Sequence, residues 1–160
     1  MSGYYDATPQ RIPHTPIVIS GSASTKYGAV ARIVGGLTSL PLLSVADLVV
    51  HESGKSAERI LDEDGEEAWR AATLRATERG LASTPFGLVV VPPDVLAQKA
   101  VRKLTRKAVL VAVRRDFEDD DLDVQVALDE AVFSVGSDEP EHELARRIVD
   151  ALRLTDDQGA

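Results

Sequence analysis

The sequence predicts an α/β fold in which helices cover both faces of a parallel sheet of about five strands. The first observation is a series of short, continuous apolar runs rich in Val, Ile and Leu, which is typical of strands that are buried on both faces. The second observation is that segments with apolar residues at helical spacing separate these runs, so helices are expected to join successive strands. The strands are expected at residues 16–20, 40–43, 88–91, 108–113 and 132–135.

The first half of the chain is expected to contain helices that begin at recognisable residues. Ser44 and Ser56 each precede a helical pattern and are expected to cap it, because a serine hydroxyl accepts a hydrogen bond from a free N–H of the first turn. Gly65 precedes a longer helix with glutamates in its first turn, and Gly80 is expected to end that helix. The helices are expected over residues 27–37, from Ser44 to about residue 51, around residues 59–61, and over residues 66–79.

The second half is expected to contain a helix over residues 94–104 and an amphipathic helix over residues 140–154. Residues 114–130 are interpreted as a connection with an acidic middle between the last two strands. Seven basic residues lie within residues 99–115, and six acidic residues follow within residues 116–123. These blocks are interpreted as a solvated helix face and a flexible acidic loop, with an interaction surface or a weak hard-cation site as the alternative.

The chain of 160 residues is expected to form one domain, because this length is sufficient to bury a core. The domain is expected to span residues 16–154, between a flexible leader over residues 1–15 and a flexible tail over residues 155–160. The core is expected to be aliphatic, since aromatic residues make up only 4% of the sequence.

Charge and composition argue against several classes of function. The formal net charge of -8 disfavours binding to nucleic acid or to an anionic membrane, and neither partner is expected. The chain has no cysteine, which excludes disulfides, thiol catalysis and thiolate metal sites. No apolar run approaches the roughly 18 residues that span a bilayer, and the N-terminus lacks a signal-peptide pattern, so a cytoplasmic location is expected.

Residues 17–31 resemble the strand, loop and helix that bind phosphate in P-loop proteins, whose loop reads G-x-x-x-x-G-K-[ST]. Counted from Gly21 without a gap, the position of the second glycine falls on Lys26. The lysine position falls on Tyr27, and the hydroxyl position falls on Gly28. All of these functional positions are altered, so the sequence predicts a degenerate phosphate loop.

Two further motifs carry a more specific resemblance. They read Gly54-x-Ser56-x-x-x-Ile60 and Gly65-Glu66-x-x-Trp69-Arg70. In register with the loop upstream, they are similar to the G-x-S-I-x-x-I-F and G-E-x-x-F-R motifs of the shikimate kinase family. The resemblance covers nearly all of residues 17–152 and implies a three-layer P-loop NTPase-like fold. It also implies ATP, Mg²⁺ and shikimate as the family's ligands, and a role in aromatic amino-acid biosynthesis.

The resemblance assigns part of a substrate site. The family's shikimate-binding arginine is present as Arg70, the expected contact for a substrate-type anion, although a structural salt bridge to Glu66 is the alternative. The family's two aspartates after strand 2 fall on Ser44 and Ala46. Asp47 lies one residue later, and a helical step of about 100° is expected to point it elsewhere.

Other family positions are also altered. The glycine triplet after strand 3 falls near residues 85–87, and the adenine-contacting arginine falls on Asp138. The family's mobile lid corresponds to part of residues 114–130, which is short and acidic, so a truncated lid is expected.

These comparisons lead to a main hypothesis and two alternatives. The main hypothesis is a shikimate-kinase-like pseudoenzyme that serves as a non-catalytic binding or regulatory module for a protein partner, with no cofactor or metal. One alternative is a binder of an anion or a shikimate-like small molecule through Arg70 and the loop amides. The other is a residual shikimate kinase that uses Lys26 with ATP and Mg²⁺.

Overall fold

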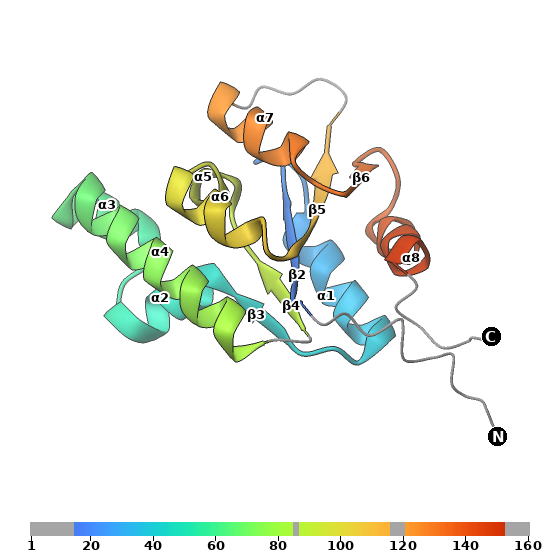
Figure 1. Cartoon of the computed structure of the whole chain (residues 1–160), viewed down its shortest axis with the longest axis horizontal. Coiled ribbons are helices and arrows are strands. Elements are labelled where there is room, and N and C mark those ends of the chain that lie inside the picture. Colours follow the sequence, from blue (N-terminus) through green and yellow to red (C-terminus); the bar gives the residue numbers. More distant parts are fainter. Residues whose placement is uncertain (1–14, 85–86, 116–120, 153–160) are drawn as a thin grey trace.

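The computed structural model describes residues 15–84, 87–115 and 121–152. The predicted leader lies outside the described residues except for Thr15, and the predicted tail over residues 155–160 lies outside them entirely. In the described part of the chain, helices flank both faces of a central sheet, which gives the layered α/β arrangement that the sequence predicts (Figure 1).

A five-stranded parallel sheet forms the centre of the fold. Its strands lie in the order β3-β4-β2-β5-β6, so β2 pairs with β4 on one side and with β5 on the other. Each predicted strand is present, with its ends displaced by at most two residues. The strands are β2 (Ile17–Gly21), β3 (Leu42–Ser44), β4 (Leu88–Val90), β5 (Val109–Arg114) and β6 (Phe133–Gly136).

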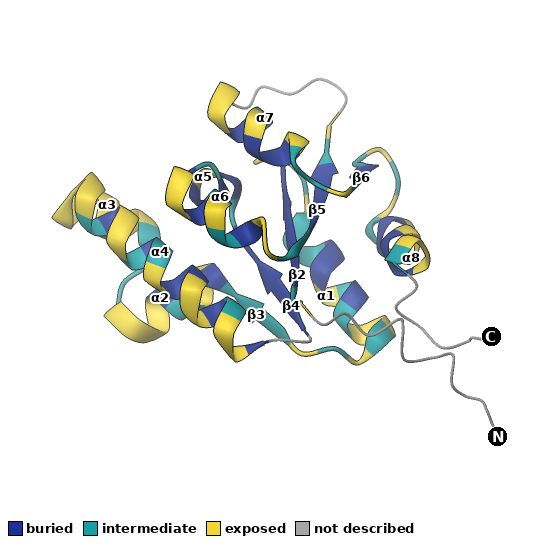
Figure 2. Cartoon of the chain, viewed as in Figure 1, coloured by how far each residue is buried: buried dark blue, intermediate teal, exposed yellow. Residues whose placement is uncertain are grey.

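The two faces of the sheet have separate cores, because successive side chains of a strand point to opposite faces. Ile17 and Ile19 of β2 pack with α1 (Tyr27–Thr38) and α8 (Glu141–Leu152), and these three elements are buried along this contact (Figure 2). Val18, between these two isoleucines, belongs to the core of the opposite face.

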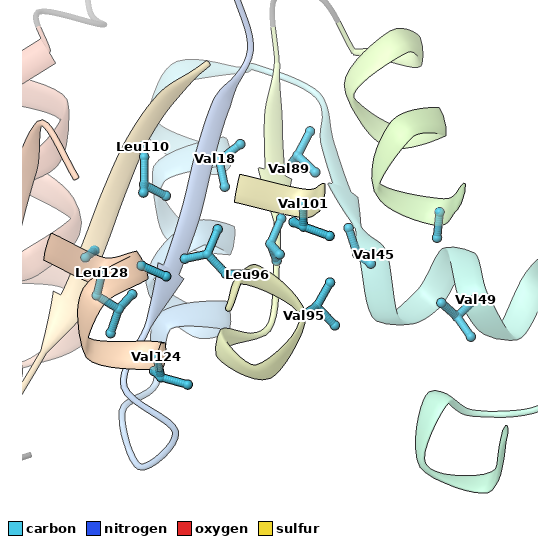
Figure 3. Packing of buried hydrophobic residues seen from close by; sticks show 14 of the residues in the cluster. Val18, Val45, Val49, Val89, Val95, Leu96, Val101, Leu110, Val124 and Leu128 are labelled. Carbon is cyan, nitrogen blue, oxygen red and sulfur yellow. The ribbon is translucent and has the colours of Figure 1, made fainter. Parts of the chain in front are cut away.

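The core of the opposite face joins Val18 and Val89 of the sheet to Leu96 and Leu128 of the covering helices (Figure 3). Its labelled side chains are aliphatic, as the low aromatic content predicts. The helices on this side and at its end are α2 (Val45–Ser53), α3 (Ala57–Asp64), α4 (Glu66–Ser83), α5 (Pro93–Leu96), α6 (Lys99–Thr105) and α7 (Leu122–Asp129). Within the described residues, none of these helices has the length and apolar character that crossing a membrane requires.

Both predicted serine caps are present. The Ser44 hydroxyl accepts a hydrogen bond from the Asp47 N–H at 3.4 Å, and the Ser56 hydroxyl accepts one from the Arg59 N–H at 3.2 Å. Gly54 ends α2 with φ of 79°, a left-handed conformation that glycine adopts without steric cost. Local sequence signals therefore set the boundaries of these short helices.

The predicted end of α4 at Gly80 is wrong, because the helix continues to Ser83. Gly80 is buried inside the helix, and a Cβ atom there would lie 3.4 Å from Leu48 and from Val89. Gly80 is therefore packed against α2 and β4 at ordinary van der Waals distance. Its position inside the helix is set by this packing, so a prediction based on helix-ending signals misplaced the end of α4.

The single helix predicted over residues 94–104 is two helices, α5 and α6. Gln98 lies between them in an extended conformation, and its side-chain amide donates a hydrogen bond to the Thr73 hydroxyl of α4 at 2.8 Å. Both side chains are buried, so this bond satisfies polar groups that water cannot reach. The residue at which the predicted helix is interrupted is thus held by a contact with a distant part of the chain.

The helix α7 lies within residues 114–130, the predicted connection with an acidic middle, where the sequence pattern was not assigned a helix. Val124, Ala127 and Leu128 are buried against the core, at the i, i+3, i+4 spacing of an amphipathic helix. The surrounding acidic residues concealed this short pattern. Residues 116–120, which hold most of the acidic block, lie outside the described residues.

Candidate functional site

The candidate site lies at the carboxyl ends of β2, β4 and β5. The connections from β2 and β4 lead to opposite sides of β2, and ligands of open α/β sheets bind in the crevice at such a point. The loop over residues 22–26 joins β2 to α1 here, at the place where the sequence predicts a phosphate loop.

The loop is held against the end of β5 by its own hydrogen bonds. The Ser22 N–H donates to the Val113 carbonyl at 2.9 Å, and the Thr25 N–H donates to the Ser22 carbonyl at 2.9 Å. The Thr25 hydroxyl also donates to the Ser22 carbonyl, at 2.7 Å. A Cβ atom on Gly21 would lie 2.4 Å from the Val113 carbonyl oxygen, so glycine is required here by the neighbouring backbone.

Lys26, the last residue of the loop, has an exposed side chain near an acidic residue. Its side chain is 75% exposed, and its Nζ lies 3.7 Å from a carboxylate oxygen of Glu141. Lys26 is the N-cap of α1 and makes no side-chain capping bond. Gly28 follows in the first turn, with open space where a side chain would begin.

Tyr27 is the first residue of α1 and is half-buried against the core formed by α1 and α8. It also lines a cavity of about 450 Å³, the loop cavity, together with Ala23, Asp94 and Asp121. Burial raises the pKa of the Tyr27 hydroxyl above its ordinary value, and the negative charge of Asp94 raises it further. An aromatic ring therefore occupies the start of α1, where the P-loop pattern has a lysine.

The raised pKa of Tyr27 predicts a specific alkaline behaviour. In a spectrophotometric titration, the difference between wild type and Tyr27→Phe is expected to show ionisation above the ordinary pKa of 10.0. Because the folded-state pKa exceeds the unfolded one, the stability linked to this group is present below pH 10.0 and is lost as pH rises through the folded-state pKa. Asp94→Asn is expected to lower this pKa, whereas Asp62→Asn is not, and equal effects of the two substitutions would contradict the assignment.

A second cavity, the inner cavity, has a volume of about 320 Å³ and lies between α2, α3, α4 and α5. Its walls include the apolar residues Val45, Val49, Trp69 and Val95. The inner cavity and the loop cavity share Pro92 and Asp94 in their linings, so they adjoin each other.

Three acidic residues, Asp47, Glu58 and Asp94, also line the inner cavity, and because all three are exposed we place them at its mouth. The expectation that Asp47 points elsewhere is wrong, because Asp47 lines the cavity together with Ala46. Both belong to the first turn of α2, which faces the cavity, so one helical step does not remove Asp47 from it. Within the described chain, no group of these side chains is arranged to hold a metal ion.

Arg70 lies outside this arrangement. Its guanidinium is exposed on α4 and contacts the Glu66 carboxylate at 2.5 Å, which is the salt bridge given above as the alternative to anion binding. Arg70 is not among the described residues that line the inner cavity. The neighbouring Trp69 does line it.

Sequence reasoning also missed residues near the loop. The Arg115 guanidinium donates to the Ser24 hydroxyl at 2.8 Å, and a further cavity of about 290 Å³ is lined by Lys26, Arg115, Glu139 and Glu141 among others. The available signal was position, since Arg115 directly follows β5 at the edge of the sheet where the loop lies. Of the glycine triplet position, residues 85–86 lie outside the described residues.

No family model and no curated protein sequence matches this chain. Its structure matches the shikimate kinase of Aquifex aeolicus with a TM-score of 0.75 at 15% identity, covering 86% of this chain and 96% of that one. The shikimate kinase of Acinetobacter baumannii, in complex with shikimate, matches with a TM-score of 0.73 at 13% identity, covering 91% and 97%. An APS kinase of Mycobacterium tuberculosis matches with a TM-score of 0.55 at 17% identity, covering 87% and 96%. At these identities the likeness concerns the fold, and it confirms the predicted shikimate-kinase-like P-loop architecture.

Proposed function

We propose that this chain, which has a shikimate-kinase-like P-loop fold, is a non-catalytic binding or regulatory module. The observation that carries the proposal is the start of α1, where the half-buried ring of Tyr27 replaces a lysine. Beside it, Lys26 is exposed and lies near Glu141. At the position where the P-loop pattern has its lysine, this arrangement therefore offers no positive charge.

The chemistry of phosphoryl transfer supports the same conclusion. Catalysis of this reaction depends on positioned positive charge and on a hydroxyl that helps to hold Mg²⁺. Tyr27 carries no charge at neutral pH, and Gly28 has no hydroxyl. The hydroxyl of Thr25 is engaged with the Ser22 carbonyl. The residues at the loop therefore do not fit magnesium nucleotide, and no catalytic step is derived through it.

The scaffold around the altered loop is complete. The central strands and the helices on both faces bury continuous aliphatic cores, with most core side chains fully inaccessible to water. Such a core keeps the fold stable without the catalytic groups, because core packing and a catalytic site depend on different residues. The protein is therefore suited to presenting a binding surface to a protein partner.

Thermal unfolding tests the proposal directly. Millimolar ATP with Mg²⁺ is expected to leave the melting temperature of this protein unchanged, and ATP with shikimate is expected to give no turnover. The Aquifex aeolicus shikimate kinase, measured in parallel, serves as the control, since a ligand at about 100 times its Kd stabilises a protein by about 2.7 kcal/mol. A clear upward shift for this chain, or turnover abolished by Lys26→Ala, would favour a residual phosphotransferase instead.

Binding of a small molecule is the second candidate function, and the inner cavity favours it. The version in which Arg70 binds a shikimate-like anion is tested by titration with shikimate and with phosphate. Affinity that is lost in Arg70→Ala would support that version. If neither shikimate nor phosphate binds, the version with Arg70 is refuted, and the ligand of the inner cavity is expected to carry a different charge.

A further inference from the structure

We propose that the inner cavity binds an organic cation with an apolar body, such as an arylalkyl or alkyl amine. The proposal rests on the non-catalytic binding function above and names the chemical class of the ligand. It follows from the apolar walls of the cavity, the unpaired carboxylates at its mouth and the lack of a basic side chain among the described residues that line it.

The walls set the requirement for an apolar body. Val49 and Val95 are almost fully buried. Trp69, which is 9% exposed, adds an aromatic side chain to the walls. The volume of about 320 Å³ lies at the small end of ligand pockets, which suits a ring with a short side chain. Transfer of such a group from water to these walls is favourable.

The mouth sets the requirement for positive charge. The carboxylates of Asp47, Glu58 and Asp94 form no ion pair with any described residue. By contrast, Glu63 on the same helix as Glu58 is paired with both Lys55 and Arg59. The charge at the mouth therefore remains available to a ligand.

The adjoining loop cavity is also lined by acidic residues. Asp94 lines both cavities, and Asp121 adds a fourth carboxylate on the side of α7. Besides burial, the negative charge of Asp94 also raises the pKa of the Tyr27 hydroxyl, which lines the loop cavity. Among the described residues that line either cavity, none is basic.

Helix N-termini do not convert the mouth into an anion site. Asp47 and Glu58 lie in the first turns of α2 and α3, where each helix dipole offsets about half a charge, so net negative charge remains. The serine caps also occupy the N–H groups of Asp47 and Arg59, which an anion would need. A shikimate-like carboxylate would face repulsion, whereas an ammonium group would be attracted.

The arrangement also favours an organic cation over a metal ion. The described carboxylates form no group of three that could hold a metal ion. An amine with an apolar body needs no shared coordination sphere, because each carboxylate attracts it through space and the walls hold its body. Charge and shape thus select the same ligand class.

The chain provides its own probe for this proposal, since Trp69 is its only tryptophan and lines the cavity. Titrations followed by tryptophan fluorescence use three ligands with one phenylethyl body: 2-phenylethylamine, 2-phenylethanol and 3-phenylpropionate. The amine is expected to bind most tightly, at least about tenfold more tightly than the carboxylate, and added salt is expected to weaken it. Equal affinities, or tighter binding of 3-phenylpropionate, would overturn the proposal.

Carboxylate-to-amide variants locate the effect. Asp47→Asn and Asp94→Asn are each expected to weaken 2-phenylethylamine about three- to tenfold and to leave 2-phenylethanol unchanged. An asparagine at position 94 keeps an oxygen that can accept the Val95 N–H, so α5 is expected to keep its start. Asp62→Asn, on the exposed face of α3, is the matched control and is expected to change neither affinity. Equal weakening by Asp62→Asn would overturn the assignment to this cavity.

The outcome for the cation is separable from the outcome for the proposed function. Preferential amine binding together with ATP turnover would retain the cation site and refute the non-catalytic function. No response to ATP, together with no preference among the three probes, would refute the cation site alone.

Discussion

Replacing Trp69 by alanine is expected to lower the free energy of unfolding by about 3–5 kcal/mol. Trp69 is 9% exposed and belongs to the core that joins α2, α3 and α4 to the sheet. Alanine removes the indole from this contact and enlarges the inner cavity, so apolar transfer energy and packing are lost together.

Urea denaturation followed by far-UV circular dichroism measures this effect. Trp69→Phe keeps an aromatic ring and is expected to cost less than the alanine variant. Arg70→Ala, one residue later, is the matched control, because the exposed ion pair with Glu66 contributes at most about 1 kcal/mol. A loss at Trp69→Ala no larger than that of Arg70→Ala would contradict a core role for the indole.

Gly21→Ala is expected to lower the free energy of unfolding by about 1–3 kcal/mol. The new Cβ atom would lie 2.4 Å from the Val113 carbonyl oxygen and 2.8 Å from the Thr25 hydroxyl. The first contact is with backbone of the adjacent strand, so relief requires β2 and β5 to separate or the loop to shift. The contact with the Val113 carbonyl therefore explains the need for glycine at position 21 without any role in phosphate binding.

Gly28→Ala tests the contrast on the other glycine of the loop region. A Cβ atom at Gly28 would have no neighbour within 4 Å, and the residue lies inside α1. The substitution is therefore expected to leave the free energy of unfolding unchanged or to raise it by up to about 1 kcal/mol. Thermal unfolding of the two variants side by side is sufficient. Comparable destabilisation by both substitutions would mean that the backbone clash at Gly21 is not the decisive feature.

The local pattern of the sequence predicted most of the architecture. Continuous apolar runs identified all five strands, and Ser44 and Ser56 marked two helix starts. These features depend on residues a few positions apart, so they can be read without knowledge of the fold. Gly80 and Gln98 were misread because their roles depend on contacts with distant elements, β4 and α4.

Some features of the candidate site are likewise local in the sequence. The sequence alone determined that the loop after β2 lacks a lysine and a hydroxyl residue at the expected positions, since Tyr27 and Gly28 stand there. It also predicted the ion pair of Arg70 with Glu66, because residues four apart meet on a helix.

Only the tertiary structure decided what the site presents to a ligand. Asp47, Glu58 and Asp94 lie on three different helices, and the order of strands in the sheet brings those helices around one cavity. Tyr27 is half-buried because α1 packs beside α8. The charge and burial of a site depend on residues that are far apart in the chain, whereas the spacing of apolar residues in the sequence depends only on near neighbours. For that reason the sequence alone determined the scaffold and its altered loop, and the packing of helices on the sheet determined the acidic, apolar-walled cavity.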